Sequence, residues 1–187
     1  MSHGVDSTVA VEDVDPFTPK VLQPLAHALN RVNRAMLGLG MIALLVASVV
    51  LTYSVFSRYL LKASTDWQDE AAVFCLVGAT FLCSAFVQAL RGHVGIEALA
   101  TLLPDGVNRV RLLLVDLMAM LFCGLFAWKS WGLFHESWVE GQTTSSSWAP
   151  PLWIPYGLML AGMVLLTLQL AVQLSARINR VLNGGRQ

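Results

Sequence analysis

Long stretches without charged residues constrain this chain more than any other feature of its sequence. Residues 35–57, 71–90 and 141–176 contain no charge, and residues 112–134 contain only Asp116 and Lys129. A helix needs about 20 apolar residues to cross the roughly 30 Å of hydrocarbon in a bilayer. Charged residues make up only 13% of the chain, about half of their share in soluble domains. The sequence therefore predicts an all-α membrane protein with four transmembrane helices, at about 35–57, 71–90, 112–134 and 153–174.

The distribution of Lys and Arg predicts on which side of the membrane each loop lies. These residues are enriched in the cytoplasmic segments of membrane proteins. Nine of the twelve lie in the N-terminal segment, the second loop and the C-terminal tail, and three (Arg58, Lys62 and Lys129) lie toward the other side. Trp and Tyr, which favour the headgroup region, gather toward that other side as well. We therefore expect both termini in the cytoplasm.

The segments that flank the spans differ in composition. Residues 1–18 hold several acids and one proline and are expected to be a disordered tail, and residues 177–187 form a basic cytoplasmic tail. In residues 19–34, apolar side chains recur every three or four positions, which predicts an amphipathic helix on the membrane surface. The alternative is a plain cytoplasmic extension of the first span. A short in-plane helix is expected between spans two and three, closed by Pro104.

Several classes of function find no support in the composition. Twelve basic and twelve acidic residues give a net charge of zero, so no nucleic-acid partner is expected. The three cysteines form no CxxC or Cys/His pattern. His93 and His135 fall on opposite sides of the predicted membrane and cannot hold one haem between facing spans. We therefore assign no catalytic, cofactor-binding or metal-binding residue.

Charged residues inside a span are the first place to look for transport or catalysis, because burying a charge in a bilayer costs about 3 kcal/mol or more. Asp116 lies five residues beyond Arg111, about 7 Å along a helix, where headgroups, water or an arginine can reach it. Lys129 can extend to the headgroups. A structural role is favoured for both. A four-span membrane enzyme or a small exporter using Asp116, His93 or Glu97 stays open as the alternative.

Two local patterns indicate packing instead. Small residues recur every fourth position in the second span, at Ala71, Cys75, Ala79 and Cys83, and small side chains let helices approach closely in lipid. In the outer turn, Arg58 is placed to pair with Asp69 or Glu70 across the hairpin. These residues suit a compact bundle or the docking of a partner.

An ordered set of short motifs resembles the small membrane subunit of the tripartite ATP-independent periplasmic (TRAP) transporters. The motifs are Arg58-Tyr59, Trp67-x-Asp69-Glu70, Phe81-Leu82, Gly92-His93-Val94-x-Ile96-Glu97, Leu103-Pro104 and Pro151-x-Trp153-x-Pro155-Tyr156. The resemblance covers about residues 22–174. The chain departs from the family pattern in two places: Cys83-Ser84 stands where Gly-Ala is usual, and Glu97 where Asp is common.

This resemblance implies a multi-pass protein of the bacterial inner membrane that is not an enzyme. Its implied partners are the large permease subunit, which carries the ion and substrate sites and moves as an elevator, a periplasmic solute-binding protein and membrane lipids. The small subunit would be a scaffold in sodium-driven import of an organic acid or similar solute. The residues expected to serve assembly are Arg58, Trp67, Asp69, Glu70, Ala71, Cys75, Ala79, Cys83, Gly92, His93, Glu97 and Trp153.

Overall fold

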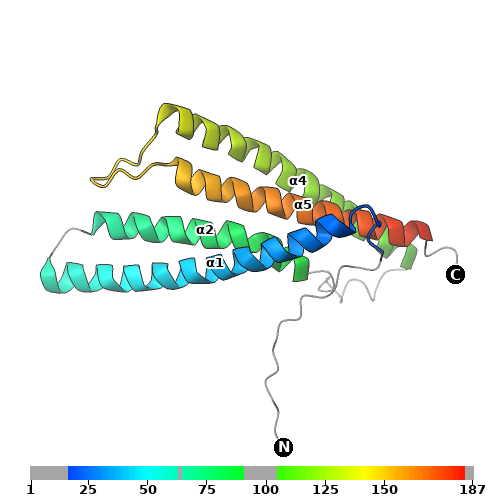
Figure 1. Cartoon of the computed structure of the whole chain (residues 1–187), viewed down its shortest axis with the longest axis horizontal. Helices are drawn as coiled ribbons and strands as arrows, with labels where there is room; N and C mark the ends of the chain where they lie inside the picture. Colours follow the sequence, from blue (N-terminus) through cyan, green and yellow to red (C-terminus); the bar gives the residue numbers. More distant parts are fainter. Residues whose placement is uncertain (1–16, 63–64, 91–104, 184–187) are drawn as a thin grey trace, which may run out of the picture.

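The computed structural model describes residues 17–62, 65–90 and 105–183, and these residues are nearly all helical. The elements in chain order are α1 (Gln23–Phe56), the short π-helix η1 (Ser57–Leu61), α2 (Asp66–Leu90), α4 (Asp105–Glu140) and α5 (Trp153–Asn183) (Figure 1). Among the described residues, four helices are long and apolar enough to cross a membrane. Each predicted span lies within one of them, so the prediction of a four-span helical membrane protein is confirmed.

The four helices lie side by side in the order α1, α2, α5, α4 (Figure 1). The α1–α2 turn and the α4–α5 loop, residues 141–152, are at one end of the molecule, here called the hairpin end. The C-terminus of α5 and the N-terminus of α1 are at the other, here called the terminal end. At the hairpin end α1 and α4 lie at opposite edges (Figure 1). The two central helices, α2 and α5, are consequently the most buried.

Two glycines allow the neighbouring helices to come close. A methyl group added at Gly40 of α1 would overlap the Cys83 sulfur of α2. A methyl group added at Gly162 of α5 would overlap the backbone carbonyl of Phe81 on α2 and lie 2.7 Å from the Phe81 Cβ. Backbone approach through small residues is the usual way in which helices pack in lipid, where no hydrophobic force drives them together.

The segment 19–34 does not form a separate surface helix over its described helical part. Helix α1 starts at Gln23 and continues unbroken through the first span, and no Gly or Pro lies between Pro24 and Gly38 to interrupt it. Ala26 and Leu29 are buried against Val172 of α5. Part of the apolar face therefore packs against α5, whereas Leu25 and Val32 of the same face are exposed, so the predicted contact with the membrane surface stays a prediction.

The chain before α1 also packs against α5. The side-chain amide of Asn179 donates a hydrogen bond to the Phe17 carbonyl at 2.9 Å, and the Arg180 guanidinium lies 4.9 Å from the centre of the Phe17 ring. Most of the predicted acidic tail and the whole of the predicted in-plane helix before Pro104 lie outside the described residues.

Candidate assembly site

The predicted ion pair across the α1–α2 turn is present at the hairpin end. Arg58 lies 3.1 Å from Asp69 and also donates a hydrogen bond to the Thr65 hydroxyl at 2.8 Å. The Ser54 hydroxyl donates to the other carboxylate oxygen of Asp69 at 3.1 Å. The π-helix η1 contains Arg58 and so helps to place it over the turn. Since the Arg58 and Asp69 side chains are 60% and 52% exposed, the pair contributes no more than about 1 kcal/mol to stability.

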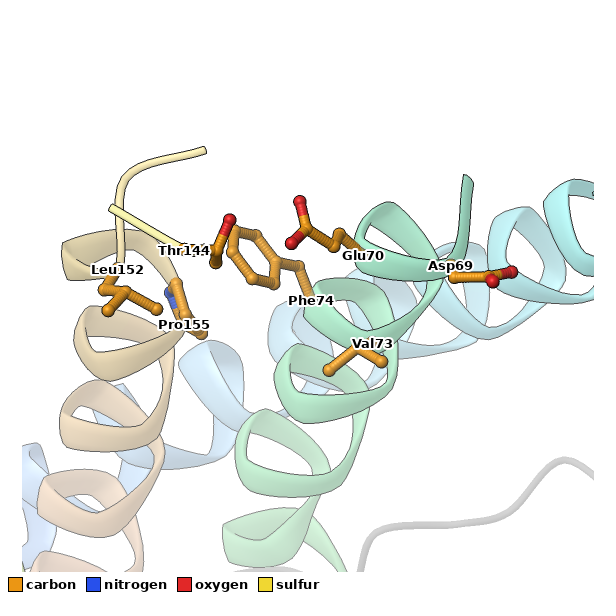
Figure 2. Close-up of a pocket in the computed structure, with 7 residues that line it drawn as sticks. All are labelled: Asp69, Glu70, Val73, Phe74, Thr144, Leu152 and Pro155. Carbon is orange, nitrogen blue, oxygen red and sulfur yellow. The ribbon is translucent and has the colours of Figure 1, made fainter. Parts of the chain in front are cut away.

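A cavity of about 380 Å³ lies at the hairpin end, between the start of α2 and the α4–α5 loop with the start of α5. Its lining residues are Asp69, Glu70, Val73, Phe74, Thr144, Leu152 and Pro155. Figure 2 shows Asp69 pointing toward α1, whereas Glu70 lies on the side of Phe74 and Thr144. One carboxylate oxygen of Glu70, Oε2, is buried and has no hydrogen-bond partner among the described residues.

The α4–α5 loop that borders this cavity has a defined conformation. The backbone N–H of Leu152 donates to the Gln142 carbonyl at 2.9 Å, and that of Thr144 donates to the Pro150 carbonyl at 3.1 Å. Ala149 adopts a φ of 45°, a conformation uncommon for a residue with a side chain. The loop is thus closed on itself by backbone hydrogen bonds beside the first turn of α5.

The small-residue stripe of α2 is partly used within the chain. Ala79 and Cys83 face Gly40 of α1, whereas Ala71 and Cys75 stay partly exposed. Among the aromatic candidates, Trp67 is 47% exposed, and Trp153 packs edge-on against Trp138 of α4 at a centroid distance of 4.9 Å. The candidates Gly92, His93 and Glu97 lie outside the described residues.

Comparison with known proteins identifies the family of the chain. The profile described as "Tripartite ATP-independent periplasmic transporters, DctQ component" matches residues 47–180, which is more than half of the chain. The chain belongs to the DctQ family. It is also 22% identical, over 84% of its own length and 92% of the relative's, to a Haemophilus influenzae protein named as a TRAP transporter small permease. No solved structure matches it significantly.

Buried and half-buried amide side chains of this DctQ protein form contacts that the sequence analysis missed. The Asn33 amide of α1 donates to the Gln169 side chain of α5 at 3.1 Å, and the two residues are 1% and 8% exposed. One turn further along α5, the Gln173 side chain accepts a hydrogen bond from the Gln88 side chain of α2 at 3.1 Å. It also donates one to the backbone carbonyl of Gln88 at 3.0 Å. Helix α5 therefore hydrogen-bonds to both α1 and α2.

The positions of charged residues within the spans did not predict these contacts, because amide side chains carry no charge. The available signal was the spacing of Gln169 and Gln173, which lie four residues apart in an otherwise apolar stretch and so share one face of the helix. Polar side chains that face a neighbouring helix in lipid commonly hydrogen-bond across the interface. The amides are therefore part of what holds the DctQ helices in their order.

The charged residue inside the third span is paired. Arg177 of α5 lies 3.0 Å from Asp116 of α4, and the two side chains are 30% and 18% exposed. Lys129, the other charge in that span, is exposed and lies 5.6 Å from the centre of the Trp128 ring. Within the described residues, no group of three or more His, Cys, Asp or Glu could hold a metal ion. The pair of Asp116 with Arg177 therefore links α4 to α5.

Proposed function

We propose that this chain is the non-catalytic small permease subunit of a TRAP transporter, a scaffold that binds and stabilises the large permease subunit. The large subunit then performs the sodium-driven import of an organic acid or similar solute, which a periplasmic binding protein delivers. Membership of the DctQ family supports a role in such a transporter. The scaffold role rests on the arrangement of the helices.

The observation that carries this proposal is the open order of the four helices. We compare the share of residues that are buried within the chain in the most apolar stretch of each helix. This share is 6% in α4 and 11% in α1, against 28% in α2 and 33% in α5. The edge helices therefore present broad apolar surfaces to lipid or to another membrane protein. A subunit that extends the fixed part of an elevator needs such surfaces and has no need of a binding pocket among its own spans.

The pairing of Asp116 argues against the exporter alternative. A carboxylate that carries a proton or ion across the membrane must exchange partners during transport, whereas Arg177 holds Asp116 at the α4–α5 contact. We therefore propose that Asp116 is structural and that the chain is not an enzyme. Replacement of Asp116 by Asn should leave transport by the whole complex intact, and an enzyme or exporter using this residue would instead lose its activity.

We propose the bacterial inner membrane as the location, with both termini in the cytoplasm and the hairpin end in the periplasm. The nine-to-three distribution of Lys and Arg supports this orientation. Reporter fusions at the two termini and in the α4–α5 loop should give a cytoplasmic signal at both termini and a periplasmic signal in the loop. A periplasmic signal from either terminus contradicts the proposed topology.

The scaffold role can be tested by reconstitution. Liposomes should contain this chain alone, the large subunit alone or both, and each set should receive the binding protein, its solute and an inward sodium gradient. Uptake should require both membrane subunits. Sodium-driven uptake by this chain alone would refute the scaffold role, and so would full uptake by the large subunit without this chain.

A further inference from the structure

The cavity beside Glu70 has a composition that suits a long basic side chain. Four apolar residues, Val73, Phe74, Leu152 and Pro155, form most of its wall, and the methylene stems of Lys and Arg pack well on such surfaces. The Phe74 ring lies beside Glu70 and is directed toward Thr144 (Figure 2). An ammonium or guanidinium at this place would meet both a carboxylate and an aromatic ring.

The carboxylates of the two acids in the cavity differ in their hydrogen-bond and ion-pair partners. Asp69 is neutralised by Arg58 and accepts a further hydrogen bond from Ser54. Glu70 Oε2 is buried without a hydrogen-bond partner among the described residues. An acid near the start of α2 is favoured by the helix dipole, but the dipole provides no donor for a buried oxygen. A buried carboxylate oxygen without a donor is costly, so a cation from outside the chain would stabilise it.

We propose that a Lys or Arg side chain of the large permease subunit enters this cavity and pairs with Glu70. This inference rests on the proposed function and adds one polar contact, at the hairpin end, to the apolar surfaces of the edge helices. The position of the cavity favours a membrane partner over a soluble one. Val73, Phe74 and Pro155 belong to the predicted spans 71–90 and 153–174, so the occupant must approach at the level of the membrane surface.

A phospholipid amine is a poorer occupant on electrostatic grounds. The phosphate of a zwitterionic lipid accompanies its ammonium within a few ångströms and would lie near Asp69 and Glu70, both acidic. Arg58, a cation at this end of α2, is already paired with Asp69. A protein side chain brings the positive charge without the accompanying phosphate.

The first test is charge reversal in the complete complex. Affinity-tagged wild-type chain should retain the large subunit through purification, and Glu70→Lys should reduce the retained amount about tenfold or more, as for removal of one partner from a buried charge pair. The isosteric change Glu70→Gln should give a smaller loss in the same direction. Ser145→Lys, at an exposed position of the α4–α5 loop outside the cavity lining, is the control for an added lysine at this end and should retain the large subunit fully. Size-exclusion profiles of each variant alone report its folding.

The second test identifies the occupant. A photo-crosslinking amino acid at Val73, which lines the cavity and is 54% exposed, should join to a peptide of the large subunit that contains Lys or Arg. Crosslinks confined to lipid, to a second copy of this chain or to the binding protein would overturn the inference, as would wild-type retention by Glu70→Lys. Failure of the wild-type chain itself to retain the large subunit would instead contradict the proposed function.

Discussion

Replacement of Gly162 by Ala tests the close approach of α5 to α2. The added methyl group would overlap the Phe81 carbonyl and lie 2.7 Å from the Phe81 Cβ, whereas ordinary contacts of a Cβ lie at 3.4–4 Å. Since the obstacle is backbone, no side-chain rotation can relieve it, and the helices must separate. Overpacking of this kind typically costs about 1–3 kcal/mol, and a backbone obstacle places Gly162→Ala at the upper end.

A matched control separates this steric cost from the effect of Ala on the helix itself. Gly132 of α4 has no atom within 4 Å of an added methyl group, so Gly132→Ala should gain up to about 1 kcal/mol from helix propensity without steric cost. Gly162→Ala makes the same gain but loses about 3 kcal/mol to the clash. The two variants should therefore differ by about 3 kcal/mol.

Thermal unfolding of the detergent-purified chain measures this difference. For a chain of this length, 1 kcal/mol corresponds to roughly 2–4 °C in Tm, so Gly162→Ala should melt about 6–12 °C below Gly132→Ala. Melting temperatures within about 2 °C of each other would refute the reasoning. They would mean that α2 and α5 do not approach each other as closely as the structure has them.

Three further substitutions test the polar contacts by the same assay. Asn33→Leu should lower the Tm because it removes a partner of the buried Gln169 amide. A double-mutant cycle of Asn33 and Gln169 should give a coupling free energy of about 0.6 kcal/mol. A coupling of zero would contradict the hydrogen bond. Arg177→Ala should destabilise the protein because it leaves Asp116 unpaired, and adding Asp116→Asn should recover part of the loss; no recovery would contradict the pairing. Arg58→Gln should change stability by about 1 kcal/mol at most, because its ion pair is exposed; a larger loss would contradict that exposure.

Much of the site could be predicted where residues are near one another in the chain. Arg58 and Asp69 are eleven residues apart across one turn, so the local geometry of a hairpin was enough to predict their contact. The choice of Asp69 over Glu70 needed the coordinates, because both acids lie near the same turn. Helix α2 turns Asp69 toward α1 and Glu70 toward the α4–α5 loop (Figure 2).

The segment 23–34 illustrates where pattern alone is ambiguous. An apolar stripe at helical spacing is consistent with burial in the membrane surface and with burial against another helix, since both environments are apolar. The contacts of Ala26 and Leu29 with Val172 show that part of the stripe is buried against α5. These contacts join positions more than 140 residues apart in the chain, which no local pattern contains.

By itself, the sequence determined the number of membrane-spanning helices, because the penalty for charge in hydrocarbon depends only on the residues of each segment. Its ordered motifs also indicated the family. Only the tertiary structure decided the order α1, α2, α5, α4, the amide contacts of α5 and the cavity beside Glu70. The reason is that lipid and neighbouring helices are equally apolar, so hydrophobicity does not mark which face of a span meets which. The packing partners are set instead by close contact of the helix surfaces, at glycines such as Gly40 and Gly162 where neighbouring helices come together.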